Sequence, residues 1–432
     1  MPAFSNSIRS ARTHRACIAL LLLAAIACSS RVSHAARVCD ARAFGAKGDG
    51  ATKDTLALQS AIDSCTAKGG GTVLLTSGTY LTGPLVLKSR ITLEVQPGAM
   101  LLGSQDHADY PRMEELREPA VQPLISASHA DHITLRGGGI IDGAGQPWWA
   151  DVTSHRHLPD FSPALRPRLI LFDHCRHIRI EGVTVQNSPS WQIVLYNTSD
   201  VLIRNGKVLA PARSPNTDGI DPFSSHHVRI EHMTIDTGDD NIAIKSGQPG
   251  SPGPDEPSTD IVIRDCAFLH GHGLSIGSEI AGGVQNVGAS HITFTGTANG
   301  VRIKSGRDRG GDIGRFTFRN LTMTNVGTPI LVTAYYGQKR DASAAPPPVT
   351  RLTPRFHDIR IAHLTATGAK QAGIIEGLPE SPITALTLSD VQIDAQRGIT
   401  VGDATIHLQN LHVTTTDGKP IVPLNAATII GH

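Results

Sequence analysis

Short segments in which hydrophobic and polar residues alternate recur along most of this chain. Typical examples are His177-Ile178-Arg179-Ile180, followed by Val183-Thr184-Val185, and His227-Val228-Arg229-Ile230, followed by Met233-Thr234-Ile235. Alternation with a period of two is the pattern of a β-strand that buries one of its faces. A short polar break follows each segment before alternation resumes, which indicates a succession of short strands joined by tight turns.

The alternating segments return at intervals that define a repeat. Segments that begin at residues 177, 200, 227, 260 and 291 are separated by 23, 27, 33 and 31 residues. Imperfect repeats of this length, each mostly strand, indicate a solenoid whose neighbouring repeats bury a shared core. We therefore predict an all-β chain that forms a single-stranded right-handed parallel β-helix. A β-propeller is the main alternative, but its blades carry regular aromatic signatures that this chain lacks.

One helix is predicted before the repeats begin, as a short N-terminal cap on the core. Its apolar positions fall on one helical stripe, Asp54 is the expected N-cap, and three glycines at 69–71 are the expected stop. The stripe consists of Leu56, Leu58, Ala61, Ile62 and Cys65.

Composition agrees with this architecture and narrows the functional classes. The 432 residues include 43 glycines, and the aromatic fraction is only 4%, which suits many short strands and an aliphatic core. Acidic and basic residues nearly cancel, 38 against 39, so no global charge favours nucleic acid or an anionic membrane surface. We expect no nucleic-acid partner, no membrane span and a monomer.

The first 35 residues have the pattern of a secretory signal peptide. Arg9, Arg12 and Arg15 precede a short apolar stretch at 18–27, and Ser33-His34-Ala35 offers small residues for cleavage after Ala35. The apolar stretch is too short for an ordinary membrane-spanning helix. We expect secretion to the periplasm or the medium, with residues 36–432 forming one catalytic domain. Lipoprotein processing at Cys28 is the alternative.

Four cysteines remain after such cleavage, and export permits disulfides. Cys39 and Cys65 flank the predicted helix and are expected to pair. Cys175 and Cys266 either pair or stay as buried free thiols, because spacing alone does not fix connectivity.

Four polar motifs occur in order across the central repeats. They are Asn216-Thr217-Asp218-Gly219, Gly238-Asp239-Asp240, Gly271-His272-Gly273 and Arg302-Ile303-Lys304. Equivalent positions in adjacent coils of a parallel β-helix lie about 4.8 Å apart. Each interval between motifs is close to one coil, so we expect Asp218 and Asp239 to stack on one outer face, with Asp240 beside them.

Carboxylates at such spacing repel, so at least one should keep its proton to a higher pH than a free aspartic acid. A protonated acid beside ionised carboxylates is the arrangement that cleaves glycosidic bonds. Arg302 and Lys304 alternate on one strand, so they point the same way and are suited to hold a substrate carboxylate. The pattern therefore favours hydrolysis of an acidic sugar polymer, with no metal and no cofactor.

These four motifs resemble the signature motifs of the polygalacturonases, glycoside hydrolase family 28. The resemblance extends from the predicted helix to about Tyr336. The sequence at 216–222 and 238–245 is particularly similar to bacterial endo-polygalacturonases. It implies a parallel β-helix that hydrolyses α-1,4-galacturonosyl linkages in de-esterified pectin with inversion at the anomeric carbon. The interval from Asp240 to His272 is longer than in short fungal members, because of an insertion at 248–258.

The resemblance also implies roles for individual residues. Asp239 would be the general acid, Asp218 and Asp240 would position and activate water, and His272 would support the acid's protonation. The substrate-binding residues would be Arg302 and Lys304 on the galacturonate carboxylate, Tyr336 in a subsite with Tyr335 as a rival for that match, and Asn216 in a structural or substrate contact.

Several functions stay open on the sequence. No large insertion obviously blocks one end of the cleft, so internal (endo) attack is preferred over an exo-polygalacturonase. A rhamnogalacturonan hydrolase is a second alternative. A calcium-dependent pectate lyase and a non-catalytic polysaccharide-binding β-helix are more distant ones.

Other polar and aromatic residues have simpler explanations than function. Histidines that begin strands are expected to be solvated or bonded to turns rather than to ligate metals; they are His132, His177, His227 and His291. Arg307 and Arg309 are expected in a solvated loop. The three tryptophans fill loop interfaces at least as often as they stack on sugars; they are Trp148, Trp149 and Trp191.

Overall fold

The computed structural model describes residues 37–155, 165–338, 340–341 and 345–431. The described residues from Val38 onward form one compact unit. The predicted signal peptide and the lipoprotein alternative at Cys28 therefore lie outside the described residues. No helix among the described residues is long and apolar enough to cross a membrane.

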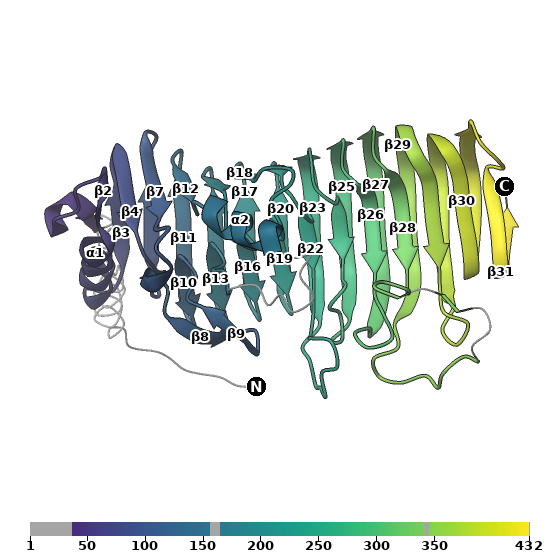
Figure 1. The fold of residues 1–432 in the computed structure, drawn as a ribbon, viewed down its shortest axis with the longest axis horizontal. Helices are drawn as coiled ribbons and strands as arrows, with labels where there is room; N and C mark the ends of the chain where they lie inside the picture. Colours follow the sequence, from purple (N-terminus) through teal and green to yellow (C-terminus); the bar gives the residue numbers. More distant parts are fainter. Residues whose placement is uncertain (1–36, 156–164, 339, 342–344, 432) are drawn as a thin grey trace, which may run out of the picture. The chain divides into compact units, whose positions relative to one another are not determined.

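The described chain winds into coils whose strands pair in parallel with the coils before and after, as predicted (Figure 1). Parallel connections of this kind are right-handed almost without exception. The result is a right-handed parallel β-helix with three strand faces per coil.

The first face carries the functional site. Its strands are β5 (Leu85–Val86), β10 (Ile125–Ser128), β13 (Ile170–Asp173), β16 (Ile193–Tyr196), β19 (Ile220–Phe223), β22 (Ile242–Ile244), β24 (Leu274–Ile276), β26 (Asn299–Lys304) and β28 (Thr328–Thr333).

The other two faces complete each coil. The second is formed by β1 (Val38–Asp40), β3 (Gly71–Leu75), β6 (Ile91–Val95), β11 (Asp131–Gly137), β14 (Arg176–Glu181), β17 (Ser199–Arg204) and β20 (His226–Glu231). The third is formed by β2 (Asp49–Lys53), β4 (Gly78–Thr82), β7 (Ala99–Gly103), β12 (Ile140–Asp142), β15 (Thr184–Gln186), β18 (Lys207–Leu209) and β21 (Thr234–Asp236).

Later coils merge these faces into longer strands. These are β23 (Ser258–Phe268), β25 (Val284–Thr295), β27 (Asp312–Thr324), β29 (Arg355–Glu376), β30 (Ile383–Thr415) and β31 (Ile421–Gly431). An antiparallel hairpin, β8 (Arg112–Glu115) and β9 (Glu118–Val121), lies outside the coils. The remaining elements are α1 (Thr55–Ala67), α2 (Gln146–His155), and two 3-10 helices, η1 (Ala41–Phe44) and η2 (His107–Asp109).

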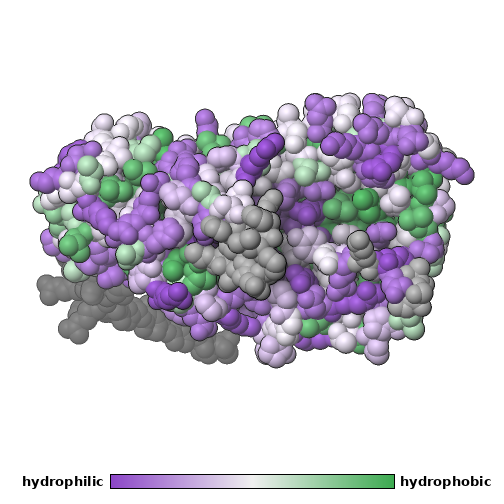
Figure 2. Space-filling view, in the orientation of Figure 1, coloured by the Kyte–Doolittle hydropathy of each residue, from purple (hydrophilic) through white to green (hydrophobic). Residues whose placement is uncertain are grey.

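The core consists of aliphatic and phenylalanine side chains stacked coil upon coil. On the second face, inward residues pair in register and are at most 2% exposed, for example Ile133, Ile178, Val201, Val228, Ile261 and Val287. The alternate residues point outward, as the period-two pattern predicts. The face seen in Figure 2 is accordingly mostly hydrophilic, with hydrophobic residues in small patches.

A ladder of left-handed residues forms the corner before the second face. The backbone φ lies between 55° and 57° at each of these residues: His132, His177, Asp200, His227 and Asp260. Histidine, aspartate and asparagine tolerate this conformation better than most residues, so the polar breaks read from the sequence are corners. Residue 291 lies one corner later than expected. Ile261 pairs with Val287 and Cys266 with Ile292, so the register aligns His291 with Asp265 and not with Asp260.

Helix α1 lies against β1 and β3 at the N-terminal end of the coils, where Leu58, Ala61, Ile62 and Cys65 are buried. The expected disulfide joins Cys39 to Cys65, while Cys175 and Cys266 are buried free thiols. Asp54 occupies the N-cap position but makes no cap bond. Its carboxylate accepts hydrogen bonds from the amides of Lys47 and Gly48, because the preceding loop folds over it.

Candidate active site

The four motifs meet on the outer side of the first face. Asp218, Asp240 and His272 lie two residues before the first residues of β19, β22 and β24, and Arg302 and Lys304 are on β26. Neighbouring strands of this face hold them in successive coils, as expected from their spacing.

The register differs from the expected stacking by one residue. Ile220 pairs with Ile242, and the amide of Gly219 donates to the carbonyl of Asp240. Asp218 therefore has Asp240, and not Asp239, as its neighbour in the next coil. The coil is 22 residues long at this point, whereas the motif spacing of 21 had suggested Asp239.

Glycines and an asparagine fix the loop that carries His272. Gly271 and Gly273 have φ of 101° and 86°, a region that residues with a Cβ rarely adopt. The side chain of Asn241 accepts from the amide of Gly273 at 2.9 Å and donates to the carbonyl of His270 at 2.7 Å. His272 is thus presented from a turn tied to the coil that carries Asp240.

Asp240 is an anion held by two cations and a hydroxyl. Its Oδ1 accepts from Arg302 Nη1 at 2.9 Å and Ser275 Oγ at 2.7 Å, and its Oδ2 accepts from Lys304 Nζ at 2.8 Å. Burial alone would raise the pKa of Asp240, but Lys304, Arg302 and Lys245 outweigh it and hold that pKa well below its usual range.

Two other buried carboxyl groups of the cluster have pKa values that are raised instead of lowered. Burial, followed by repulsion from Asp239 and Asp221, raises the pKa of Asp218 well above its ordinary value. Burial also raises the pKa of Asp221 to about 8, against the opposing effect of Lys245. Both oxygens of Asp221 lack a hydrogen-bond partner among the described residues. We expected one carboxyl group of the cluster to keep its proton to a higher pH than a free aspartic acid, and the groups whose pKa is raised are Asp218 and Asp221.

A buried lysine lies between these groups. Lys245 Nζ is 2.9 Å from Glu279 Oε2 and 4.0 Å from Asp218 Oδ2, and it lies 4.7 Å from the centre of the Trp191 ring. Burial opposes its charge, but Glu279, Asp218 and Asp221 raise the pKa of Lys245, so it stays protonated. The same contact lowers the pKa of Glu279 to about 2, although burial opposes this.

Sequence reasoning missed Asp221, Lys245, Ser275 and Glu279. Three of them were within reach of the alternation rule that we applied to Arg302 and Lys304. Asp221, Lys245 and Ser275 occupy the corresponding outward positions of their strands, as the pairing of Ser275 with Arg302 and the bridge between Phe223 and Lys245 show. Glu279 lies in a loop, where no periodicity applies.

Asp239 and His272 form the solvent-facing part of the cluster. His272 Nδ1 is 2.9 Å from Asp239 Oδ1 and 3.7 Å from Asp240 Oδ1, and the two side chains are 37% and 24% exposed for His272 and Asp239. The contact between His272 and Asp239 is short enough for an ion pair, but His272 Nδ1 is not oriented to form a hydrogen bond. Of the three aspartates in the motifs, Asp239 is the one that solvent reaches, since the side chains of Asp218 and Asp240 are 5% and 1% exposed.

The structure separates the two candidate tyrosines. The ring centre of Tyr336 lies 5.0 Å from Lys304 Nζ and 5.8 Å from Arg302 Cζ, and its side chain is partly exposed. Tyr335 is nearly buried, between the guanidinium groups of Arg307 and Arg340. Tyr336 therefore belongs to the site.

Asn216 is exposed at the start of its motif, and its Oδ1 accepts from Arg166 Nη2 at 2.7 Å. The loop arginines have partners as well: Arg307 pairs with Glu380, and Arg309 with Asp308. Those two arginines are thus bound to neighbouring side chains rather than simply solvated.

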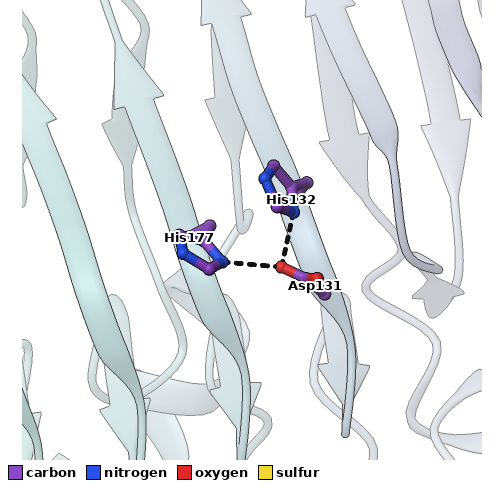
Figure 3. A group of neighbouring side chains, drawn as sticks. All are labelled: Asp131, His132 and His177. Atoms are coloured by element: carbon purple, nitrogen blue, oxygen red, sulfur yellow. Dashed lines mark hydrogen bonds and ion pairs between the residues drawn. The ribbon is translucent and has the colours of Figure 1, made fainter.

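The tryptophans and the strand-initial histidines have structural contacts. Trp148 and Trp149 are buried, and Trp148 stacks on His107. At the corner of β11 and β14, Asp131 Oδ1 lies 2.6 Å from His132 Nδ1 and 2.8 Å from His177 Nδ1 (Figure 3). His132 and His177 belong to the left-handed ladder, which places their exposed side chains on adjacent coils beside Asp131.

The donor atoms of Asp239, Asp240 and His272 lie within 4.8 Å of one another, a proximity that a metal site would also require. Calcium takes six to eight oxygen ligands. Both oxygens of Asp240 are already engaged, one with Lys304 and one with Arg302 and Ser275. Two fixed cations beside the carboxylate do not fit a calcium site, which disfavours the lyase alternative.

Comparison with known proteins agrees with this arrangement. The model of glycosyl hydrolases family 28 matches residues 65–416. A probable polygalacturonase of Vitis vinifera is 33% identical over 391 residues, which cover 85% of this chain and 75% of the relative. An endo-polygalacturonase of Pectobacterium carotovorum subsp. carotovorum is 28% identical over 384 residues, covering 85% of this chain and 89% of the relative.

Among solved structures, a hyperthermoactive exopolygalacturonase from Thermotoga maritima superposes with a TM-score of 0.77 at 27% identity, covering 88% of this chain and 92% of that one. The four motifs, the coil register and these matches agree. The chain belongs to glycosyl hydrolase family 28.

Proposed function

We propose that this chain is a secreted polygalacturonase that hydrolyses α-1,4-galacturonosyl linkages in de-esterified pectin by an inverting acid/base mechanism. The observation that carries the proposal is the cluster of Asp218, Asp239 and Asp240 on one outer face, where fixed cations hold the pKa of Asp240 below its usual range and burial raises the pKa of Asp218. Relatives that are named polygalacturonases support the substrate class.

In this mechanism Asp239 is the general acid. Burial, followed by repulsion from Asp239, raises the pKa of Asp218, so the Asp218 and Asp239 pair shares one proton. When that proton is on the partly exposed Asp239, it can be passed to the glycosidic oxygen, and Asp218 is left as an anion beside Asp240. His272, 2.9 Å from Asp239, supports that protonation state. Asp240, fixed as an anion, acts with Asp218 to position and activate the attacking water.

Substrate recognition is assigned to the cationic side of the site. Arg302 and Lys304 carry the positive charge needed for a galacturonate carboxylate, and Tyr336 lies against both. Asn216 orients Arg166 beside the cluster and serves as a structural or substrate contact. We expect the enzyme to act as a monomer without a cofactor.

The test is incubation with de-esterified polygalacturonate, with reducing ends and ultraviolet absorbance followed together. Hydrolysis predicts new reducing ends without unsaturated products, and no effect of EDTA. Absorbing products that EDTA abolishes would assign a lyase instead, and polymer binding without reducing ends would assign a non-catalytic protein. Rhamnogalacturonan, offered in parallel, should be a poor substrate; preferential cleavage of it would reassign the substrate class.

A further inference from the structure

The outer side of the first face is covered on one side of the catalytic cluster and open on the other. The outward residues Leu171 and Val194 of the preceding coils, and Phe223 on the same strand as Asp221, are at most 3% exposed. Toward the C-terminal coils, the outward residues Leu331 and Thr333 are partly exposed. Outward hydrophobic side chains are buried only where something packs on them.

The covering element is the β8–β9 hairpin. Leu116, at its tip, packs with Leu171, Val194 and Phe223 in a hydrophobic cluster separate from the main core. Glu115 of the hairpin forms an ion pair with Arg168. Arg168 in turn lies 4.6 Å from the ring centre of Trp191, which also contacts Lys245.

Loops from distant parts of the chain fix the hairpin in this position. Arg117 Nη1 lies 3.0 Å from Asp255 Oδ1, and Gln248 Nε2 donates to the carbonyl of Leu116 at 3.2 Å. The Asp255 side chain is 1% exposed and also binds Ser251 Oγ at 2.8 Å and Arg351 Nη1 at 3.4 Å. Contacts from the insertion at 248–258 thus hold the hairpin against the first face.

The obstruction begins close to the reacting groups. Val194, which is covered, pairs in register with Asp221 of the cluster, and adjacent coils are about 4.8 Å apart. A polymer that runs across the strands would meet Leu116 within one or two coils of the carboxylates. On that side there is room for one or two sugar units only.

We infer that the β8–β9 hairpin closes one end of the groove and makes this enzyme exo-acting, releasing galacturonate units of one or two sugars from a chain end. The inference rests on the proposed function. We had preferred internal attack because no large insertion in the sequence obviously blocks one end of the cleft. The position of the hairpin removes that reason. Both endo- and exo-acting relatives exist, so the family does not decide the question.

The direct test follows products and viscosity together on de-esterified polygalacturonate. Exo action predicts mono- or digalacturonate as the products from the first time points, and little loss of viscosity while reducing ends accumulate. An early ladder of longer oligomers with rapid loss of viscosity would overturn the inference and leave the proposed hydrolase intact. Absence of new reducing ends would overturn the proposed function, and this inference with it.

Two variants test the hairpin itself. Replacement of residues 112–121 by a short Gly-Ser linker should open the groove, so that longer products appear and viscosity falls faster per bond cleaved. Arg117→Ala, which removes the contact with Asp255 but keeps the hairpin, should shift products in the same direction to a smaller extent. Glu114→Ala, at an exposed hairpin position, is the matched control. Unchanged mono- or disaccharide products from a folded linker variant would overturn the role of the hairpin.

Discussion

The ammonium group of Lys304 lies 2.8 Å from Oδ2 of Asp240, and both side chains are at most 5% exposed. A buried pair of this kind fixes the charge of the carboxylate, since removing either partner leaves the other buried and uncompensated. Asp240 is therefore ionised over the whole working pH range, and the protonation changes in the cluster fall on its neighbours.

Lys304→Met should lower kcat/KM by about 10- to 100-fold, because a charge-assisted hydrogen bond contributes roughly 1.5–3 kcal/mol. The pKa of Asp240 should rise when this cation is lost, which brings protonation of Asp240 into the working pH range and moves the acidic limb of the pH–rate profile to higher pH. Steady-state kinetics from pH 3 to 8 measure both effects. Lys207→Met, at an exposed position on β18, should behave as the wild type. An unshifted limb would show that Lys304 does not set the charge of Asp240.

The two adjacent tyrosines should separate binding from stability. Tyr336→Ala should raise KM by up to about tenfold, which corresponds to a loss of about 1.4 kcal/mol of binding free energy, because the exposed ring lies beside Arg302 and Lys304, where bound substrate would contact it. Truncation of an exposed side chain should change the free energy of unfolding little. Tyr335→Ala should instead lower Tm, because its ring is nearly buried against Arg307 and Arg340. Kinetics and thermal melts of the pair check this. The reverse pattern would give the subsite to Tyr335.

Sequence reasoning reached the fold because the period-two pattern is a direct record of which side chains face the core. Ile178, Val201 and Val228 were placed correctly from alternation alone, and they stack in the interior. The polar breaks were also informative, since His177, Asp200 and His227 mark one corner. Register was the weaker point, because coil length varies and 21 residues were taken as one coil where the pairing requires 22.

The parts that sequence did not predict depend on contacts between distant segments. Nothing near Leu116 in the sequence indicates that it packs on Val194, or that Asp255 holds Arg117. The charge state of Asp221 is similar, because it depends on burial and on Lys245 from the next coil. Local patterns specify strands and turns, whereas loop packing and electrostatics require the assembled coils.

Asp221→Asn should change how stability depends on pH. The folded pKa of Asp221 is about 8 against 3.8 for the free group. Between these values the unfolded chain releases a proton that the folded chain retains, so this group lowers the free energy of unfolding as pH rises. Asparagine cannot ionise, so the Tm of the variant should fall less between pH 5 and pH 8. Between pH 5 and pH 8, the free energy of unfolding of the wild type should fall by up to a few kcal/mol more than that of the variant, since one pKa unit corresponds to about 1.4 kcal/mol.

Calorimetry at pH 5, 6.5 and 8 measures this effect. Asp200→Asn, on the partly exposed corner ladder, is the control and should follow the wild type. If Asp221→Asn and the wild type lose stability in parallel, then Asp221 is not protonated in the folded protein at neutral pH.

Removal of the Cys39–Cys65 disulfide should cost stability without affecting catalysis. The bond closes a loop with a sequence separation of 26, for which cross-linking contributes roughly 3 kcal/mol. The Cys39→Ser/Cys65→Ser variant should therefore unfold at lower denaturant concentration and keep its kcat. A large loss of kcat in the folded variant would indicate that the N-terminal cap influences the site.

The most direct test of the account is the rate of release of reducing ends from polygalacturonate by Asp239→Asn, compared with Asp200→Asn. Asparagine keeps the shape of the side chain but cannot donate the proton, and general acid catalysis contributes about 10²–10⁴-fold. We predict that kcat falls by about 10³-fold or more while Tm and polymer binding stay near the wild-type values. A kcat within a few-fold of the wild type would contradict the assignment of this cluster as the hydrolytic site.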